Sequence, residues 1–475
     1  MKVTFVVCNI DLIKHKGSLI PQWESTYREG VASMAALLQS NGVDVGLLKL
    51  STGVSAARLE TLWSSQLADT DLAAFTINAV DFPEAKRIAG ILKSRQPSLR
   101  TICGGVHPTL CPEECIIEPA FDIVCRGEGE HVMLELCEKL QSGSDLEHLE
   151  GLWTKSSGVI RRNAPRPLMV DLSELPAPAR DLPAVSDYDQ DKVRDTTFFM
   201  ATRGCPYQCA YCCNHSLSQI YSNPQDYYRF KPVEAFIGEL RSYIVNHPAI
   251  SWLALYDDMM MGDREWFEDF SGRYARKIAR RIFMTARWEL LDEHTVALLK
   301  RMSVVYVLVG LEVGDPQIRC EVLNRQQSDE LMTRGGTLLR KHGIRFGVYT
   351  MVGVPTETHV KALKTVKLAA RVGGNPLLGH HTIYFPFEGT PLYARCKEEG
   401  LLSDRQVRSY FNDTRLDMPD FTRKEIRWAH QRFKPFCLGY WLTGKLPSLL
   451  HDPLTRFLDR CWLAWGPRHP GHRAD

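Results

Sequence analysis

Four cysteines lie within nine positions of the chain, in the stretch ATRGCPYQCAYCCN at residues 201–214. Three of them, Cys205, Cys209 and Cys212, have a CxxxCxxC spacing. Three thiolates on one short loop can hold a metal centre, because the thiolate is the form of cysteine that ligates metals. Cys213 is a poor additional ligand, since its side chain diverges from that of its neighbour Cys212.

Two kinds of metal centre suit this loop. A closed structural zinc site needs four ligands, usually as two separated pairs, so zinc would require Cys213, His215 or a distant residue as well. A 4Fe–4S cluster can be held by three thiolates at three corners, which leaves one iron open to bind a substrate or cosubstrate. Buried structural cysteines and a disulfide are the remaining interpretations, and the position of the cysteines directly after a strand-like run disfavours both.

The bulk properties narrow the class of protein. A chain of 475 residues is too long for one ordinary core, so we expect two or three domains. The formal net charge of +2 gives no basic excess for nucleic acid. The N-terminal run MKVTFVVCNID lacks a signal-peptide cleavage site, and no stretch of about 18 apolar residues is present. We therefore expect a cytoplasmic protein with reduced thiols.

The first part of the chain alternates between strand-like and helix-like runs. The short apolar, β-branched runs lie at residues 2–9, 44–51, 71–77, 100–105 and 122–127. This rhythm predicts an α/β domain with a doubly wound parallel sheet over residues 1–145, whose ligand would sit at the carboxyl ends of the strands. The proline-rich passage 161–183 predicts a linker over residues 146–190.

A longer strand–helix rhythm follows. Six apolar runs lie at residues 196–202, 252–258, 282–287, 304–312, 344–353 and 377–386. They predict a partial (β/α)6 TIM-like barrel over residues 191–395, with its chemistry at the carboxyl ends of the strands. Polar residues follow several of these runs, among them Asp257, Asp258, Arg287 and Glu312. Residues 396–475 read as a helical C-terminal segment.

The cysteine motif, with aromatic Tyr211 before its last cysteine, resembles the radical S-adenosylmethionine (SAM) superfamily. The segments TRGCPYQCAYC, GLEVGDPQIRCEVLNR, GVPTE and FPFEGTPLY resemble further motifs of that family, in the expected order over roughly 190–395. In the family, the open iron of the cluster binds SAM, and one electron from the cluster cleaves it to a 5′-deoxyadenosyl radical. The resemblance implies a 4Fe–4S cluster on Cys205, Cys209 and Cys212, and a reducing partner such as flavodoxin or ferredoxin.

The same resemblance places Tyr211, Glu312, Arg325, Gly353 and Pro355 in the SAM pocket. Glu312 has the alternative of a structural carboxylate paired with a barrel arginine, and Arg325 that of a helix cap. An acidic pair closes the second barrel strand in the subgroup, as Asp257 and Asp258 do here, although a solvated turn is the alternative. The sequence departs from the family pattern at three positions, Val313, Thr356 and Glu388, which bear on details of the pocket.

Two glycine-rich stretches stand out in the first domain, CGGVHPTLCPEE at residues 103–114 and CRGEGEHVMLEL at residues 125–136. Paired glycines permit close approach of a ligand to the backbone, and a helix N-terminus can do the same for a phosphate. Taken singly, each glycine can equally mark a turn. Together they resemble the cobalamin-binding domain of one radical SAM subgroup, which implies cofactor contacts from Gly104, Gly105, His107, Pro108, Thr109, Gly127, Glu128 and Gly129.

No DxHxxG motif, whose histidine would coordinate cobalt, is present. Many members of the subgroup lack it, so the resemblance implies cobalamin with its lower cobalt face unligated. His107 has two interpretations, a cobalt ligand or a loop histidine that is hydrogen-bonded or packed against the cofactor, and we favour the second.

The C-terminal segment interleaves aromatic and basic residues, as in RWAHQRFKPFCLGYWLTGKLPSLL. We expect a cap over the barrel mouth, with peripheral contact to a membrane surface as the alternative. The whole sequence predicts a cobalamin-dependent radical SAM enzyme, most simply a methyltransferase acting on an unactivated carbon of a lipid or other small molecule. Alternatives are a radical cyclase, oxidative or rearrangement enzyme, as in tetrapyrrole ring formation, and a non-catalytic iron–sulfur or cobalamin redox sensor. A methylthiolating enzyme of RNA fits less well.

Overall fold

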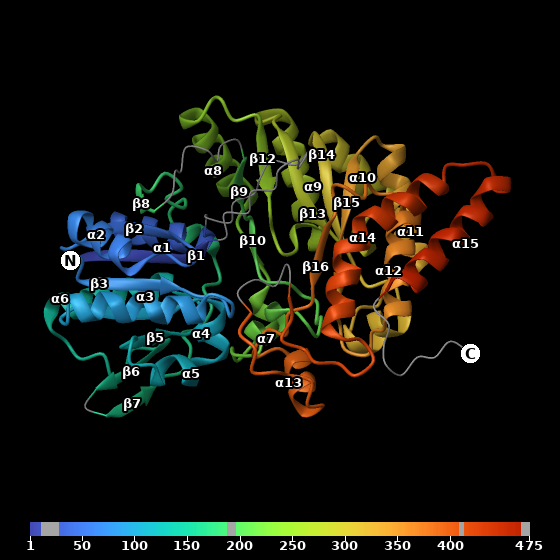
Figure 1. Ribbon diagram of the computed structural model, residues 1–475. Coiled ribbons are helices and arrows are strands. Elements are labelled where there is room, and N and C mark those ends of the chain that lie inside the picture. The colour runs from blue at the N-terminus through green and yellow to red at the C-terminus, as the bar shows by residue number, and fades with distance from the viewer. Residues whose placement is uncertain (11–27, 157, 188–195, 408–412, 467–475) are drawn as a thin grey trace. The chain divides into compact units, whose positions relative to one another are not determined.

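The computed structural model describes residues 1–10, 28–156, 158–187, 196–407 and 413–466. The chain divides into two compact units (Figure 1). The first unit comprises Met1–Gly204 and Ser216–Ala235, and the second comprises Cys205–His215 and Phe236–Asp475. The cysteine loop therefore belongs to the second unit, although the residues on either side of it belong to the first.

The first unit is built on a doubly wound sheet. Strands β1 (Lys2–Ile10), β2 (Asp44–Ser51), β3 (Leu72–Thr76), β4 (Arg100–Gly104) and β5 (Ile123–Cys125) pair in parallel in the order β5-β4-β3-β1-β2. Apolar residues are buried on both faces of these strands, as parallel sheets require. The strand order reverses between β1 and β3, and the carboxyl ends of strands at such a switch point form the ligand crevice of this fold.

Helices cover both faces of this sheet. Helices α1 (Glu29–Ser40) and α6 (Glu130–Ser142) pack on one face, and α2 (Ala56–Gln66) and α3 (Phe82–Arg95) on the other. Two short helices, α4 (Val106–Leu110) and α5 (Pro112–Ile117), follow β4. The predicted doubly wound domain is confirmed, although the sheet is not entirely parallel.

Three further strands of this sheet come from the passage in which the sequence predicted a linker. Strands β6 (Leu152–Ser156) and β7 (Val159–Arg162) form an antiparallel hairpin beside β5, and β8 (Ala184–Ser186) pairs with β2. The predicted linker thus adds edge strands at both ends of the sheet. A two-stranded ribbon of β10 (Thr202–Arg203) and β11 (Arg229–Phe230) completes the first unit.

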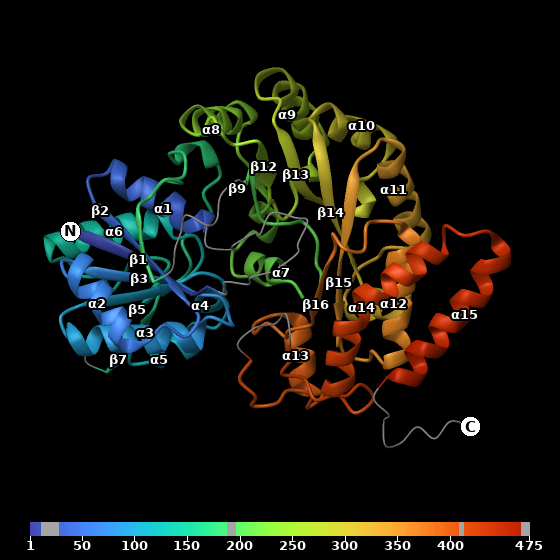
Figure 2. The same cartoon turned by 45° about the horizontal axis from the view of Figure 1, so that its top comes forward.

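The second unit contains a parallel sheet with helices on its outer side (Figure 2). Strands β12 (Trp252–Leu255), β13 (Arg281–Ala286), β14 (Val304–Glu312), β15 (Arg345–Val352) and β16 (His380–Ile383) lie side by side in chain order. Helices α8 (Val233–Asn246), α9 (Arg264–Lys277), α10 (Glu293–Arg301), α11 (Asp329–Lys341) and α12 (His359–Val372) alternate with them. The first predicted strand of the barrel is β9 (Thr196–Phe199), and the partial barrel is confirmed.

Polar caps fix where these outer helices begin. The side chains of Asp263, Asp292, Ser328 and Thr358 each accept a backbone N–H from the first turn of the helix that follows. Such a cap satisfies an N–H group that the helix itself leaves without a partner. The four helices α9 to α12 thus begin at residues that the sequence specifies.

The C-terminal part is helical, as predicted. Helix α13 (Pro391–Glu398) follows the last strand, α14 (Arg423–Thr443) packs along α12 and beside β16, and α15 (Ser448–Trp465) packs on α14 and α12. Thr422 and Glu425 form a capping box at the start of α14. Among the described residues, no helix has both the length and the apolar composition needed to cross a membrane.

Candidate active site

The cysteine loop is held by backbone-level hydrogen bonds from two other segments of the second unit. Ala210 N donates to Leu323 O at 3.0 Å, and Leu392 N donates to Ala210 O at 2.9 Å. The side chain of Asn324 donates to Gln208 O at 2.7 Å. These bonds fix the loop between the segment after β14 and the start of α13, so the cysteines are presented by a rigid support.

All 14 cysteines of the chain are free, which excludes the disulfide interpretation of the motif. Cys209 is buried, whereas Cys205 and Cys212 are half-buried. Burial raises the pKa of the Cys205 thiol to about 12, so this ligand loses its proton when a metal binds.

N–H groups are directed at two of the three sulfur atoms. Arg287 Nη1 lies 3.6 Å from Cys209 Sγ, and Asn214 Nδ2 lies 3.9 Å from Cys212 Sγ. Hydrogen bonds and a nearby positive charge stabilise thiolate ligands and tune an iron–sulfur cluster. The donor set of Cys205, Cys209 and Cys212 therefore fits a 4Fe–4S cluster. Cys213 hydrogen-bonds to Cys212 and lowers the pKa of that thiol, which is a supporting role rather than that of a fourth ligand.

Arg325 connects the cysteine loop to the end of β14. Its Nη1 lies 3.9 Å from Cys209 Sγ, 3.1 Å from Tyr211 Oη and 3.5 Å from Glu312 Oε1. Its Nη2 donates to Gly310 O at 2.9 Å, so one buried guanidinium joins three of the residues predicted from the sequence. The helix-cap interpretation of Arg325 therefore has no support in these contacts.

A π-helical turn at Ile318–Val322 precedes Arg325 in the chain and positions its side chain beside Cys209. Leu323 N donates to Ile318 O at 3.0 Å, which is the five-residue spacing of a π turn. Such turns often occur at functional sites, because they place one extra residue in the helix and redirect the side chains that follow.

Glu312 stands at the carboxyl end of β14 with a left-handed backbone, φ +65°. This conformation is unfavourable for a residue with a side chain and is commonly maintained at functional sites. Burial raises the pKa of Glu312, and the positive charge of Arg325 opposes that rise. Gly310 leaves room for the pair, because a Cβ there would overlap Glu312 Oε1 and lie 2.6 Å from Arg325 Nη2.

The turn after β15 contains Gly353 and Pro355, which the sequence predicted in the SAM pocket. Gly353 has φ +84° and its N–H donates to Glu357 Oε2 at 2.6 Å, while Pro355 is buried. Thr356, which replaces the second glycine of the family motif, keeps the left-handed backbone, with φ +66°. The turn therefore retains its shape despite the substitution, and β15 pairs with β14 up to Glu312, so both ends lie at one edge of the sheet.

The two aspartates after β12, Asp257 and Asp258, have different surroundings. Asp257 is buried, and its backbone oxygen accepts from Thr285 Oγ1 at 2.8 Å. Asp258 hydrogen-bonds to Asn214, and its negative charge helps to raise the pKa of the Cys205 thiol. The part of both aspartates in the SAM pocket stays a prediction.

The glycine-rich loops of the first unit lie together at the carboxyl ends of β4 and β5. Gly127 N donates to Thr109 Oγ1 at 3.1 Å, which joins the loop at residues 104–109 to the loop at residues 127–130. Gly105 has φ +104°, and a Cβ there would approach Ile77 O at 3.0 Å. These loops, the buried Pro108 included, stand at the sheet edge where this fold places its ligand. The site therefore fits cobalamin, although residues 11–27, which follow β1, lie outside the described residues.

His107 is buried inside the first unit. Its ring lies 4.8 Å from that of Phe82, and its Nε2 lies 3.4 Å from Glu114 Oε2. Both neighbours are side chains of the protein, so which of the two interpretations of His107 holds stays a prediction. The absence of a protein nitrogen below cobalt remains a prediction.

Glu128, predicted as a cofactor contact, lies in an ion-pair network inside the first unit. Arg203 Nη1 donates to Glu128 Oε1 at 2.9 Å, and Arg229 Nη2 donates to the same oxygen at 2.6 Å. Arg203 also pairs with the buried Glu130. Burial acts to raise the pKa of Glu128, but the positive charges of Arg229 and Arg203 lower this pKa overall.

The glycines on either side of Glu128 have protein neighbours as well. A Cβ on Gly127 would lie 2.5 Å from Tyr221 Oη, and one on Gly129 would lie 2.7 Å from Met34 Sδ. These contacts neither establish nor remove a role in cobalamin binding for Gly127, Glu128 and Gly129, which stays a prediction.

Sequence reasoning missed three members of the site in the second unit. The sequence analysis noted Arg287 only as a polar residue at the end of a strand. In the structure it contacts Cys209, and its guanidinium carbon lies 3.6 Å from the centre of the Tyr207 ring. Glu289 pairs with Arg287 at 2.7 Å, and Gln327 accepts from Arg325 Nε at 2.9 Å. Their position in the sequence could have indicated a role in the site, because Arg287 and Glu289 directly follow a barrel strand.

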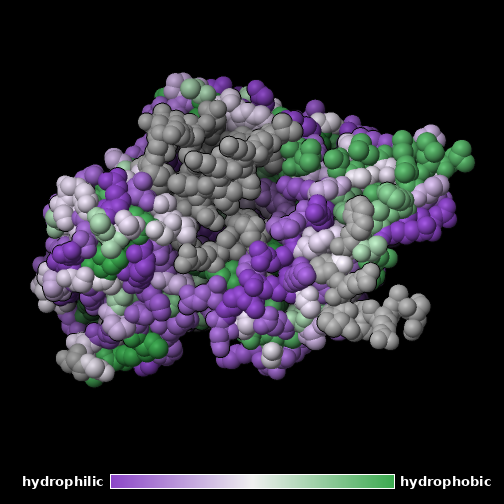
Figure 3. Space-filling model, viewed as in Figure 1, coloured by the Kyte–Doolittle hydropathy of each residue, from purple (hydrophilic) through white to green (hydrophobic). Residues whose placement is uncertain are grey.

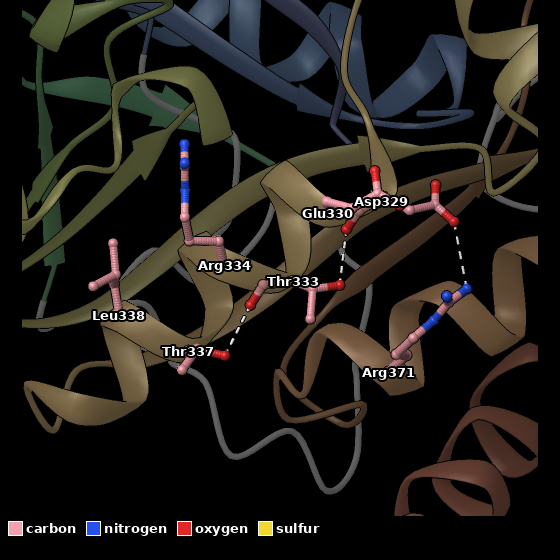
Figure 4. A pocket seen from close by; sticks show the side chains of 7 residues that line it. All are labelled: Asp329, Glu330, Thr333, Arg334, Thr337, Leu338 and Arg371. Atoms are coloured by element: carbon pink, nitrogen blue, oxygen red, sulfur yellow. Dashed lines mark hydrogen bonds and ion pairs between the residues drawn. The ribbon is translucent and has the colours of Figure 1, made fainter.

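A separate pocket in the second unit lies away from these residues, on helices α11 and α12 (Figure 4). Asp329 and Arg371 on its wall form an ion pair at 3.4 Å, and Asp329 also pairs with Arg319 at 2.6 Å. Glu330 also lines this pocket, and none of the site residues predicted from the sequence lines it.

Two family models match the chain. The radical SAM superfamily model matches residues 200–369, and the B12 binding domain model matches residues 26–137. An uncharacterized methyltransferase of Pyrococcus horikoshii is 28% identical over 362 residues, which are 75% of this chain and 76% of that protein. An anaerobic magnesium-protoporphyrin IX monomethyl ester cyclase of Rubrivivax gelatinosus is 24% identical over 322 residues, which are 65% of this chain and 55% of the cyclase.

A solved structure shares the fold. The radical SAM methyltransferase TsrM from Kitasatospora setae, with cobalamin and a [4Fe–4S] cluster bound, superposes with a TM-score of 0.64 and 16% sequence identity. The similarity covers 84% of this chain and 75% of that one. The two domains imply a 4Fe–4S cluster and SAM in the second unit and cobalamin in the first. The chain therefore contains a radical SAM domain at residues 200–369 and a B12 binding domain at residues 26–137.

Proposed function

We propose that the protein is a cobalamin-dependent radical SAM methyltransferase that acts on an unactivated carbon of a small molecule or lipid. The observation that carries the proposal is the constellation around Arg325, which contacts Cys209, Tyr211 and Glu312 at once. When bound, the cluster with SAM would supply hydrogen abstraction from a C–H bond, and cobalamin would supply the methyl group. A C–H bond of this kind has no acidity that a general base can use.

The chain's own residues would hold and orient these groups. Cys205, Cys209 and Cys212 would ligate the cluster, and Arg287 would stabilise the charge on Cys209. Glu312 and Arg325 offer a carboxylate and a guanidinium side by side, which complement an ammonium and a carboxylate group of SAM. A reduced flavodoxin or ferredoxin is the class of partner that would deliver the electron.

The test uses purified protein whose cluster is reconstituted without oxygen. The wild type should convert SAM to 5′-deoxyadenosine when a strong reductant is added. Cys209→Ala should lose this activity together with most of its iron, because a cluster ligand is gone. Cys437→Ala is the matched control, since it removes a buried thiol of α14 outside the cysteine loop and should keep both iron and SAM cleavage. If the wild type did not cleave SAM, a non-catalytic redox sensor would replace the enzyme proposal. If Cys209→Ala cleaved SAM as the wild type does, the assignment of Cys209 as a cluster ligand would fail.

A second candidate is a radical cyclase, and the similarity to the magnesium-protoporphyrin ester cyclase favours it. The two reactions differ in their by-products, because a methyl donor that has transferred its methyl group leaves S-adenosylhomocysteine. Methylation predicts S-adenosylhomocysteine together with 5′-deoxyadenosine during turnover with lipid or metabolite extracts. Formation of 5′-deoxyadenosine alone, with a product lighter by hydrogen atoms, would favour cyclisation.

A further inference from the structure

The hairpin of α14 and α15 carries a row of exposed apolar side chains. Leu449 is 83% exposed and Phe457 is 59% exposed. Figure 3 shows apolar residues gathered over α15 and the adjoining end of α14. The exposed large apolar side chains of this surface, which we call the α15 face, are Leu442, Leu446, Leu449, Leu450, Leu454, Phe457 and Leu463.

The opposite side of α15 is fixed by packing. Trp462 is fully buried, and its Nε1 donates to His359 O at 3.0 Å. Asp459 pairs with Lys367 at 2.7 Å and accepts from Tyr440 Oη at 2.6 Å. These contacts set the rotation of the helix, so the α15 face points away from the second unit.

The helical spacing makes the α15 face continuous. Leu449, Pro453 and Phe457 are four residues apart, and residues at this spacing lie above one another on a helix. Leu450 and Leu454 form the adjoining row. A contiguous apolar patch on a surface marks an interaction site.

Basic residues border the α15 face. Lys445, Arg456 and Arg460 are exposed, and Lys445 lies 3.2 Å from the centre of the Trp441 ring. Among residues 442–466, the acidic side chains are Asp452 and Asp459, and Asp459 is already paired with Lys367. An apolar helix face with a basic border complements anionic lipid, which offers acyl chains below a layer of negative headgroups.

We propose that the α15 face docks on an anionic membrane surface, with Leu449 and Phe457 inserted among the acyl chains. A second copy of the chain fits this face less well, because a symmetric contact would bring Arg456 and Arg460 of both copies together. The docking is peripheral, since α15 would lie in the plane of the headgroups. It stands apart from the proposed reaction, because binding to a lipid surface needs neither cluster nor cobalamin.

The experiment is cosedimentation of the full-length protein with vesicles of phosphatidylcholine alone and of phosphatidylcholine mixed with phosphatidylglycerol. The wild type should prefer the mixed vesicles. The double variant Leu449→Asp/Phe457→Asp should lower the vesicle-bound fraction about tenfold or more, because two apolar side chains become charged. Arg456→Glu/Arg460→Glu should abolish the preference for anionic lipid.

The matched control is Val245→Asp/Leu377→Asp, which places the same charges on exposed apolar positions outside the α15 face, 77% and 50% exposed. This variant should bind vesicles as the wild type does. The proposal is overturned if the wild type binds neither kind of vesicle, or if Leu449→Asp/Phe457→Asp and Arg456→Glu/Arg460→Glu both bind like the wild type. A dimer in lipid-free solution that Leu449→Asp/Phe457→Asp converts to a monomer would assign the face to a second copy and would equally overturn it.

Discussion

Gly310 is the residue on which the geometry of the Arg325 constellation depends most directly. Gly310→Ala should displace the Glu312–Arg325 pair, because its Cβ would overlap Glu312 Oε1. We expect SAM cleavage to fall by about tenfold or more, since even one lost charge-assisted hydrogen bond has an effect of this order. Gly238→Ala is the control, because no atom lies within 4 Å of a Cβ at that position in α8. Equal activity of the two variants would contradict the assigned role of the pair.

Glu357 is the residue whose protonation should affect stability. Burial raises its pKa from 4.5 to about 8. Between these values the folded state keeps a proton that the unfolded chain releases, so this group's contribution to stability is full below about pH 4.5 and is lost as the pH rises towards 8. Glu357→Gln cannot ionise, and its unfolding temperature should fall less than that of the wild type from about pH 5 to pH 8.

Thermal unfolding monitored without oxygen at several pH values tests this expectation. Glu398→Gln changes an exposed carboxylate at the end of α13 and serves as the comparison, since its profile should follow that of the wild type. Parallel profiles for Glu357→Gln and the wild type would show that the proton is not held in the fold.

Among the elements, the β10–β11 ribbon is anchored by charge. Arg203 on β10 and Arg229 on β11 both pair with Glu128, and Arg203 also pairs with the buried Glu130. Glu130→Gln would leave Arg203 partly uncompensated, and breaking a buried pair costs about 3–5 kcal/mol. We expect a lower unfolding temperature and a lower iron content, because Arg203 directly precedes the cysteine loop in the chain.

Glu135→Gln on α6 is the matched control for that variant. Its ion pair with Arg166 is exposed and should contribute about 0–1 kcal/mol. Iron analysis and thermal unfolding of both variants decide the point. Equal losses for Glu130→Gln and Glu135→Gln would contradict an anchoring role for the buried pair.

At the scale of the whole molecule, the chain divides into two compact units, and the B12 binding domain lies in the first. We expect two thermal transitions, of which cobalamin raises the one that belongs to the first unit. Cobalamin at a hundred times its dissociation constant stabilises by about 2.7 kcal/mol, which corresponds to a rise of roughly 5–10 °C for a unit of this size. Scanning calorimetry with and without hydroxocobalamin measures the shift. A transition pair that cobalamin leaves unchanged would contradict cofactor binding by the first unit.

Sequence reasoning predicted the parts of the fold that periodicity and position encode. The predicted strand at residues 304–312 has the same bounds as β14. A buried strand is apolar along almost its whole length, so its ends can be read from the sequence. The strands β6, β7 and β8 escaped prediction because they are short. In addition, β7 is largely exposed and β8 directly follows a proline, Pro183. Edge strands depend on the neighbour that they join, which a local pattern does not contain.

The candidate site was predictable where a motif carries it. Arg325 contacts Cys209, Tyr211 and Glu312, which are all residues that the resemblance named, and their roles stay predictions. The contacts of Arg287 with Cys209 and of Glu128 with Arg203 and Arg229 were not predicted, because each joins residues far apart in the sequence. Such pairs form only in the folded chain, so the pattern of a single sequence segment does not predict them.

The π-helical turn at Ile318–Val322 has a consequence for the evolution of this site. Removing one residue there would let the segment close as an ordinary α-helix, which folds at least as readily. The residues beyond it would then rotate by about 100° relative to the sheet, and Arg325 would turn away from Cys209. Exposed positions in the turn, such as Cys320 and Glu321, can change identity at little cost. The length of the segment is therefore constrained, and a deletion there should be more damaging than a substitution at one of the exposed positions of the turn.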